Sequence, residues 1–145
     1  MFKIDYNIGA ESFSDIEEIT DIDISYRFLQ GNVVFHADNV IINMAWDWIP
    51  LLDFSFRLSE IAKTLTNKEK SHECFEFTES AETLKFYKND DELKVIPSFS
   101  PAVIEIKFEE FNIEVEKFHQ SISTYIKEKV NKTIANKFVN KYLST

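Results

Sequence analysis

Few residues in this sequence have the type and spacing that catalysis or metal binding requires. The three histidines, His36, His72 and His119, are far apart, and none belongs to a His-Glu-x-x-His pattern. The single cysteine, Cys74, has acidic neighbours that disfavour a thiolate. Two glycines are too few for a phosphate-binding glycine-rich loop. We therefore expect no catalytic residue, no metal site and no cofactor.

Carboxylates are plentiful, so pairs of them arise by chance. Glu109 and Glu110 stand at the start of a helical pattern, where acidic side chains complement the helix dipole. The cluster Asp90-Asp91-Glu92 is typical of a turn and lacks the glycine and the spacing of a calcium-binding loop. These pairs favour structural roles.

One acidic run stands out, formed by Asp15, Glu17, Glu18, Asp21 and Asp23. In the alternating pattern around them, Asp21 and Asp23 are expected on the same face of a strand. Like charges so close are unfavourable unless water or a cationic partner surrounds them. The run is therefore either a solvated surface or a binding site for a cationic partner.

The second feature is Trp46-Asp47-Trp48, which contains both tryptophans of the chain. In an extended strand, Trp46 and Trp48 point to one side and Asp47 to the other. Paired tryptophans are common in cores, and they are also enriched at the centres of protein interfaces. Both interpretations stay open at this point.

Charge is unevenly distributed along the 145 residues, whose formal net charge is −9. Residues 1–60 contain 11 acidic and 3 basic side chains, whereas residues 117–145 contain 6 basic and 1 acidic. An acidic surface repels nucleic acid and attracts cationic partners, although net charge also serves solubility. We expect a protein partner and no direct binding to nucleic acid or membrane.

The first half of the chain alternates between strand and helix patterns. Residues 2–8 and 21–28 alternate apolar and polar side chains, which predicts half-buried strands. Gln30-Gly31-Asn32 predicts a turn, so 21–28 is expected to form a hairpin with a strand at 33–36. A short strand at 40–45 is followed by a helix that starts after Pro50 and ends near Leu65.

The second half is predicted to contain four strands and a long helix. The strands are expected at 74–78, 83–88, 93–96 and 103–108. From Phe108 onward the apolar spacing becomes helical. The apolar stripe then drifts around the helix, which predicts a break near Asn131 and a basic helical tail over 131–145.

Together these patterns predict a single α+β domain spanning residues 1–145. We expect an antiparallel sheet of about six to seven strands, with a central helix and a long C-terminal helix on one face. The start of the sequence is charged and has no apolar targeting segment, and one thiol suits a reducing compartment. We therefore expect a cytoplasmic protein.

The segment Trp48-Ile49-Pro50-Leu51-Leu52-Asp53-Phe54 resembles the start of the central helix in small bacterial immunity proteins of toxin systems, including contact-dependent inhibition. In those proteins a strand pair precedes the helix. The strands that follow are matched by 82–86 and 95–99, and the closing helix by Phe111, Val115 and Phe118. The resemblance covers roughly residues 26–130.

This resemblance implies a cytoplasmic protein that blocks the active site of a toxin, with no catalytic residue of its own. The expected partner is a basic toxin domain such as a nuclease, attracted by the acidic run and anchored by Trp46 and Trp48. Two alternatives remain. One is a structural or adaptor subunit that forms a homo-oligomer through the C-terminal helix. The other is a small enzyme or carrier whose sheet holds an apolar ligand.

Overall fold

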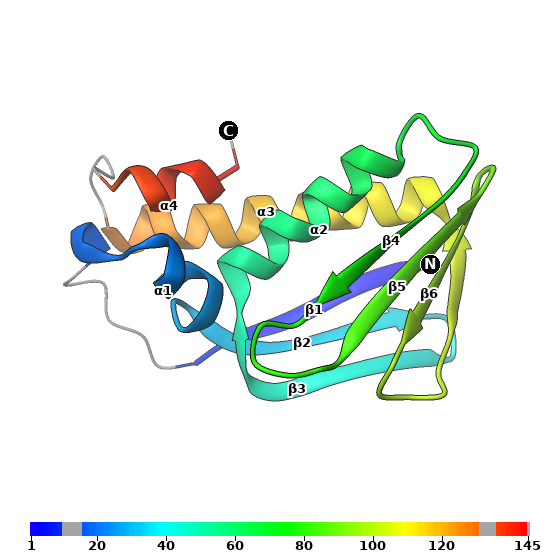
Figure 1. Ribbon diagram of the computed structural model, residues 1–145, viewed down its shortest axis with the longest axis horizontal. Coiled ribbons are helices and arrows are strands. Elements are labelled where there is room, and N and C mark those ends of the chain that lie inside the picture. The colour runs from blue at the N-terminus through cyan, green and yellow to red at the C-terminus, as the bar shows by residue number, and fades with distance from the viewer. Residues whose placement is uncertain (10–15, 131–135, 145) are drawn as a thin grey trace.

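The computed structural model describes residues 1–9, 16–130 and 136–144 and shows an α+β fold with two antiparallel sheets (Figure 1). The first sheet has three strands in the order β1 (Phe2–Ile8), β2 (Gln30–Ala37) and β3 (Val40–Pro50). The second has four, β4 (Lys70–Glu76), β5 (Thr83–Asn89), β6 (Glu92–Pro97) and β7 (Ile104–Lys107). Each strand pairs with its neighbour in sequence, so no parallel crossover is needed.

In the described residues, two long helices cover the sheets, and three short helical elements lie at one end (Figure 1). The helical elements are η1 (Ile16–Glu18), α1 (Asp21–Tyr26), α2 (Leu51–Leu65), α3 (Phe108–Val130) and α4 (Lys137–Tyr142). Figure 1 shows α2 and α3 side by side along the same side of both sheets, and the two helices are in contact. The long helix α3 also packs along β1. The expected α+β class, with a central and a long C-terminal helix, is confirmed, and the seven strands divide into two sheets.

The predicted strand at residues 21–28 is wrong, because this segment begins with the helix α1. Thr20 and Asp23 form a capping box, in which the Asp23 N–H donates to the Thr20 hydroxyl oxygen (3.4 Å) and the Thr20 N–H to the Asp23 carboxylate (3.0 Å). Ile24 and Phe28 are buried, whereas Ile22 is 66% exposed. Ile22 and Ile24, which a strand would place on one face, therefore differ in burial, and the capped helix overrides the alternation. The expected hairpin of 21–28 with 33–36 is absent, since β2 pairs with β1 and β3.

The core lies between the helices and the inner faces of the two sheets, and Phe54 is near its centre. This fully buried ring of α2 is 6.3 Å from Phe35 of β2 and 4.9 Å from Phe75 of β4, measured between ring centroids. It also contacts Phe118 of α3 (6.1 Å). Phe54 therefore joins both sheets to both long helices. Phe56, on the other side of α2, is half-buried against Tyr142.

The C-terminal residues return to the body of the protein. The predicted break near Asn131 falls outside the described residues, which show α3 ending at Val130 and α4 beginning at Lys137. Asn136 caps α4 by accepting from the N–H groups of Phe138 (2.8 Å) and Val139 (3.1 Å). The Asn136 amide also donates to the carbonyl of Ile16 (2.8 Å). The basic tail is thus anchored beside η1.

Candidate functional site

The clearest irregularity in the sheets is a bulge in β3. Gly31 of β2 pairs with Ile49 and Val33 pairs with Met44, so Asn32 alone faces the four residues 45–48. Asp47 lies in the middle of this bulge with φ 68°, a left-handed conformation that is costly for a residue with a side chain. Bulges of this kind re-aim side chains and concentrate next to functional sites.

Asn32 holds the bulge in place through two reciprocal hydrogen bonds. The Asp47 N–H donates to the Asn32 side-chain oxygen at 2.8 Å. The Asn32 amide donates to the Asp47 carboxylate at 2.9 Å and to the Asn7 side-chain oxygen at 2.9 Å. One side chain of β2 therefore fixes the strained residue of β3 and connects it to β1.

The bulge stacks the two tryptophans on each other. The Trp46 and Trp48 rings are 5.4 Å apart, at an interplanar angle of 15°, and both are half-buried. The edge contacts of Trp46 reach Phe77 (5.2 Å) and Phe99 (4.7 Å), which follow β4 and β6. The expectation that the tryptophans share one side is confirmed. The buried part of each tryptophan ring thus fills the junction of the two sheets. The rest of each ring and the exposed Asp47 side chain face solvent.

Helix α1 lies beside this tryptophan pair. The Gln30 amide donates to the carbonyls of Tyr26 (3.2 Å) and Trp48 (3.3 Å), joining the end of α1 to β3. The Thr78 hydroxyl donates to the Ser25 carbonyl at 2.8 Å. Asp23 is one helical turn from Tyr26, about 4.5 Å along the axis. We define the α1–β3 surface as the candidate residues of α1 and of the β3 bulge, two elements that are in contact, and its members are Asp21, Asp23, Tyr26, Trp46, Asp47 and Trp48.

The acidic run does not form a single cluster. Asp21 and Asp23 lie in the first turn of α1, not on a strand face, where negative charge complements the helix dipole. Hydrogen bonds from the backbone and side chain of Thr20 lower the pKa of Asp23 below its usual value, as does nearby Arg27. Glu17 and Glu18 are exposed on η1, beside the start of α4. Asp15 lies outside the described residues.

Sequence patterns do not predict the residues that assemble this surface. Asn32 was interpreted as part of a turn, and Phe77 and Phe99 as ordinary strand residues. Their roles depend on contacts between the two sheets, which no local pattern records. Asn32 itself fits the alternation of β2, so no local signal distinguishes it.

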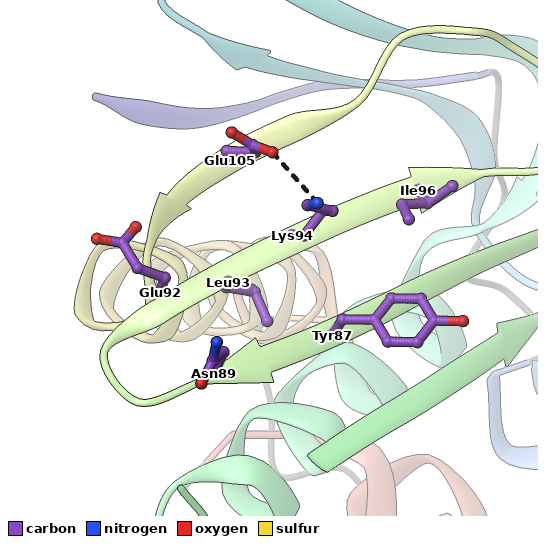
Figure 2. A pocket seen from close by; sticks show the side chains of 7 residues that line it. All are labelled: Tyr87, Asn89, Glu92, Leu93, Lys94, Ile96 and Glu105. Atoms are coloured by element: carbon purple, nitrogen blue, oxygen red, sulfur yellow. Dashed lines mark ion pairs between the residues drawn. The ribbon is translucent and has the colours of Figure 1, made fainter. Parts of the chain in front are cut away.

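The outer face of the second sheet carries a broad, open depression of about 600 Å³ (Figure 2). Tyr87 and Ile96 of neighbouring strands lie along it, and Lys94 pairs with Glu105 at 3.4 Å. Both charged side chains of that pair are well exposed. Exposed ion pairs contribute little binding or stability, so this face is a weaker candidate than the α1–β3 surface.

The remaining candidates for chemistry are scattered. His36 pairs with Asp5 (3.0 Å) at the surface, His72 stacks on Tyr87, and His119 is buried with Nε2 2.6 Å from the Tyr142 carbonyl. Within residues 1–9, 16–130 and 136–144, no three side chains of histidine, cysteine, aspartate or glutamate converge as a metal site would need. In the same ranges, no helix combines the length and apolar character needed to cross a membrane.

Fold and site together define an α+β protein with an acidic, aromatic surface at the junction of two small sheets. The chain matches no protein-family model, no curated protein and no solved structure. The function must therefore be argued from the surface itself.

We expect Asn32→Ala to release the bulge and to lower the free energy of unfolding by about 1–2 kcal/mol. The strained Asp47 loses its hydrogen-bond acceptor, while the tryptophans lose the backbone that stacks them. Both tryptophans of the chain are in this surface, so intrinsic fluorescence measures the change directly. Asn39→Ala, in the exposed β2–β3 turn, is the control. An unchanged emission spectrum in Asn32→Ala would show that Asn32 does not position the pair.

Proposed function

We propose that this protein is a non-enzymatic binding protein that uses the α1–β3 surface to bind a cationic protein. The observation that carries the proposal is the stacked Trp46–Trp48 pair, which a strained and hydrogen-bonded bulge holds at the surface. A regular strand would satisfy the sheet at lower cost, and backbone strain of this kind is retained at functional sites. Tryptophan and tyrosine are also the residue types that dominate binding energy at interfaces.

The charge of this surface sets the class of partner. The α1–β3 surface contains three carboxylates and no basic member. Arg27 is the nearby basic residue, and its guanidinium is 3.4 Å from the Asp23 carboxylate. A basic partner would be attracted to these carboxylates over a long range. It would meet little repulsion, because Arg27 is the basic residue beside them. The rest of the first 60 residues adds to the acidic field.

The biological role that we propose is immunity to a bacterial toxin in the cytoplasm, by occlusion of the active site of a basic toxin domain. Nucleases are the class that fits this mechanism best, because an acidic surface can occupy the positions of substrate phosphates. The exposed, free Cys74 suits such a reducing compartment. The proposal assigns no catalytic residue to this chain.

The alternative of a homo-oligomer through the C-terminal helix has less support. Oligomerisation through α4 needs an apolar face that is free in the monomer. Val139 is instead buried within one chain, and the Tyr142 ring is 4.8 Å from the Phe56 ring. The apolar side of α4 is thus used internally.

The test is capture of a basic partner from the products of neighbouring genes, at low and at high salt. Charge steering predicts that the association rate falls about tenfold or more when salt rises from 50 mM to 500 mM. The Asp23→Lys variant should bind more weakly than Glu109→Lys, which makes the same reversal of charge in the first turn of α3, far from α1 (Figure 1). Equal binding by both variants, or an association rate indifferent to salt, would count against the proposal.

A further inference from the structure

A concave polar site lies next to the α1–β3 surface, between α1, α2, α4 and the end of β4. Its volume is about 440 Å³. Phe56, Phe77 and Tyr142 form aromatic walls, while Ser25 and Thr78 add polar groups. Phe77 also contacts both tryptophans, so the two sites share a wall. We call this open depression the Asp53 pocket, after the buried carboxylate among its three charged lining residues, Asp53, Arg57 and Glu76.

Asp53 is the unusual member of the pocket, because its carboxylate is buried with incomplete compensation. The side chain is 5% exposed, and its one ion pair joins Oδ2 to the Arg57 guanidinium at 3.4 Å. Burial raises the pKa of Asp53 from 3.8 to about 6, although Arg57 acts in the opposite direction. A carboxylate kept in a cavity at a cost to stability is a feature of binding sites.

Arg57 donates a long hydrogen bond to Asp53 (3.4 Å) and divides its guanidinium among other contacts. Its guanidinium lies 4.0 Å from the centre of the Phe75 ring and donates to the Glu76 carbonyl at 3.1 Å. These contacts hold the cation at the rim, where a third of its side chain is exposed. Asp53 and Arg57 both line the pocket, so the buried carboxylate lies at its wall beside a partly exposed cation.

The remaining groups around the pocket add negative charge. Glu76 lines it beside Asp53, against the single cation Arg57. Burial raises the pKa of Tyr142, and the carboxylates of Asp53 and Asp21 raise it further, so both acids act on this hydroxyl. One carboxylate oxygen of Asp21 is buried and has no hydrogen-bond partner among the described residues. Such an environment repels anions and favours cations.

We propose that the Asp53 pocket binds an ammonium or guanidinium group, held by the Asp53 carboxylate and packed against the rings of Phe56 and Phe77. Aromatic rings attract cations through their faces, so the apolar walls and the charge select the same chemistry. Two sources are compatible with this: a lysine or arginine side chain of the protein partner, or a small free amine. Only the first source rests on the proposed function.

The test is an NMR titration of the full chain with n-butylguanidinium, n-butylammonium and the neutral n-butanol. The cations should shift the amide signals of Ser25, Thr78 and Tyr142 saturably at millimolar concentration, whereas n-butanol should not. Affinity should fall about tenfold between pH 7.5 and pH 5, as Asp53 becomes protonated. Asp53→Asn should reduce the affinity at least tenfold, while Asp90→Asn, the same change in an exposed turn, should leave it unchanged.

Equal shifts with n-butanol, or full affinity in Asp53→Asn, would overturn the proposal. Phe56→Leu provides a second variant if Asp53→Asn does not fold, and a two-fold or greater loss is expected there, because the change removes an aromatic wall and keeps an apolar side chain. Capture of the protein partner by Asp53→Asn distinguishes the two sources of the cation. If Asp53→Asn also weakens partner capture, the partner supplies the cation. If it abolishes n-butylguanidinium binding and leaves partner capture intact, the pocket binds a free amine. The binding role of the α1–β3 surface is then unaffected by this result.

Discussion

Replacing Phe54 by alanine is expected to lower the free energy of unfolding by about 3–5 kcal/mol. The ring is fully buried, and it contacts Phe35, Phe75 and Phe118 from three different elements. These elements are already fixed by their own strand pairing and helix packing, so they cannot collapse into the space left behind. The loss therefore includes a cavity as well as the transfer energy of the ring. Urea unfolding followed by tryptophan fluorescence measures it.

Phe56→Ala is the matched control for this prediction. It removes the same ring from the same helix, but at a half-buried position whose main ring contacts are Tyr142 and His119. We expect a loss of about 1–2 kcal/mol, because water and α4 can occupy the vacated volume. Equal losses in the two variants would contradict the central position that the structure gives to Phe54.

Asp53→Asn is expected to stabilise the protein at pH 7.5 by up to about 3 kcal/mol. That figure is the free energy equivalent of a pKa raised from 3.8 to about 6 in the folded state. Since the folded pKa lies above the unfolded one, the Asp53 carboxyl favours folding below about pH 4. This contribution is lost as the pH rises through about 6. The neutral amide in the Asp53→Asn variant does not lose this stability at high pH. The dipole at the N-terminus of α2 stabilises the wild-type carboxylate and so reduces the expected difference.

The pH dependence gives this prediction its control. Wild type and Asp53→Asn should have nearly equal stability at pH 4 and should diverge as the pH rises past 6, with the variant more stable. The exposed Asp90→Asn should follow wild type throughout. If Asp53→Asn were instead less stable at pH 7.5 than at pH 4 relative to wild type, the Arg57 pair would outweigh burial. The carboxylate would then be a structural group.

Much of the fold could be predicted from the sequence, because its strongest signals are local. The alternation in residues 2–8 and 83–88, and the stripe from Leu51 to Leu65, correspond to β1, β5 and α2. The segment 21–28 failed because two local signals compete there. Its apolar alternation is that of a strand, but Thr20 and Asp23 cap a short helix that buries Ile24 and leaves Ile22 exposed. The capping box was the better guide.

The division into two sheets and the candidate surface were harder to foresee. Nothing local indicates that Phe77 and Phe99, which follow β4 and β6, pack against Trp46 of β3. The tryptophan pair and part of the acidic run were found from composition alone. Their placement together depends on Gln30, whose amide joins α1 to β3. Asp53 was visible only as a helix residue, since burial is a property of the assembled structure.

We propose that the α1–β3 surface binds a basic protein through its tryptophan pair. The most direct test compares the affinity of the captured partner for wild type, Trp46→Ala and Tyr87→Ala by calorimetry, after unfolding curves show that each variant is folded. Tyr87 is an exposed aromatic residue on the outer face of the second sheet and serves as the control. We predict that Trp46→Ala loses about 2 kcal/mol or more, roughly 30-fold in affinity, while Tyr87→Ala binds as wild type. A folded Trp46→Ala variant with undiminished affinity would contradict the claim.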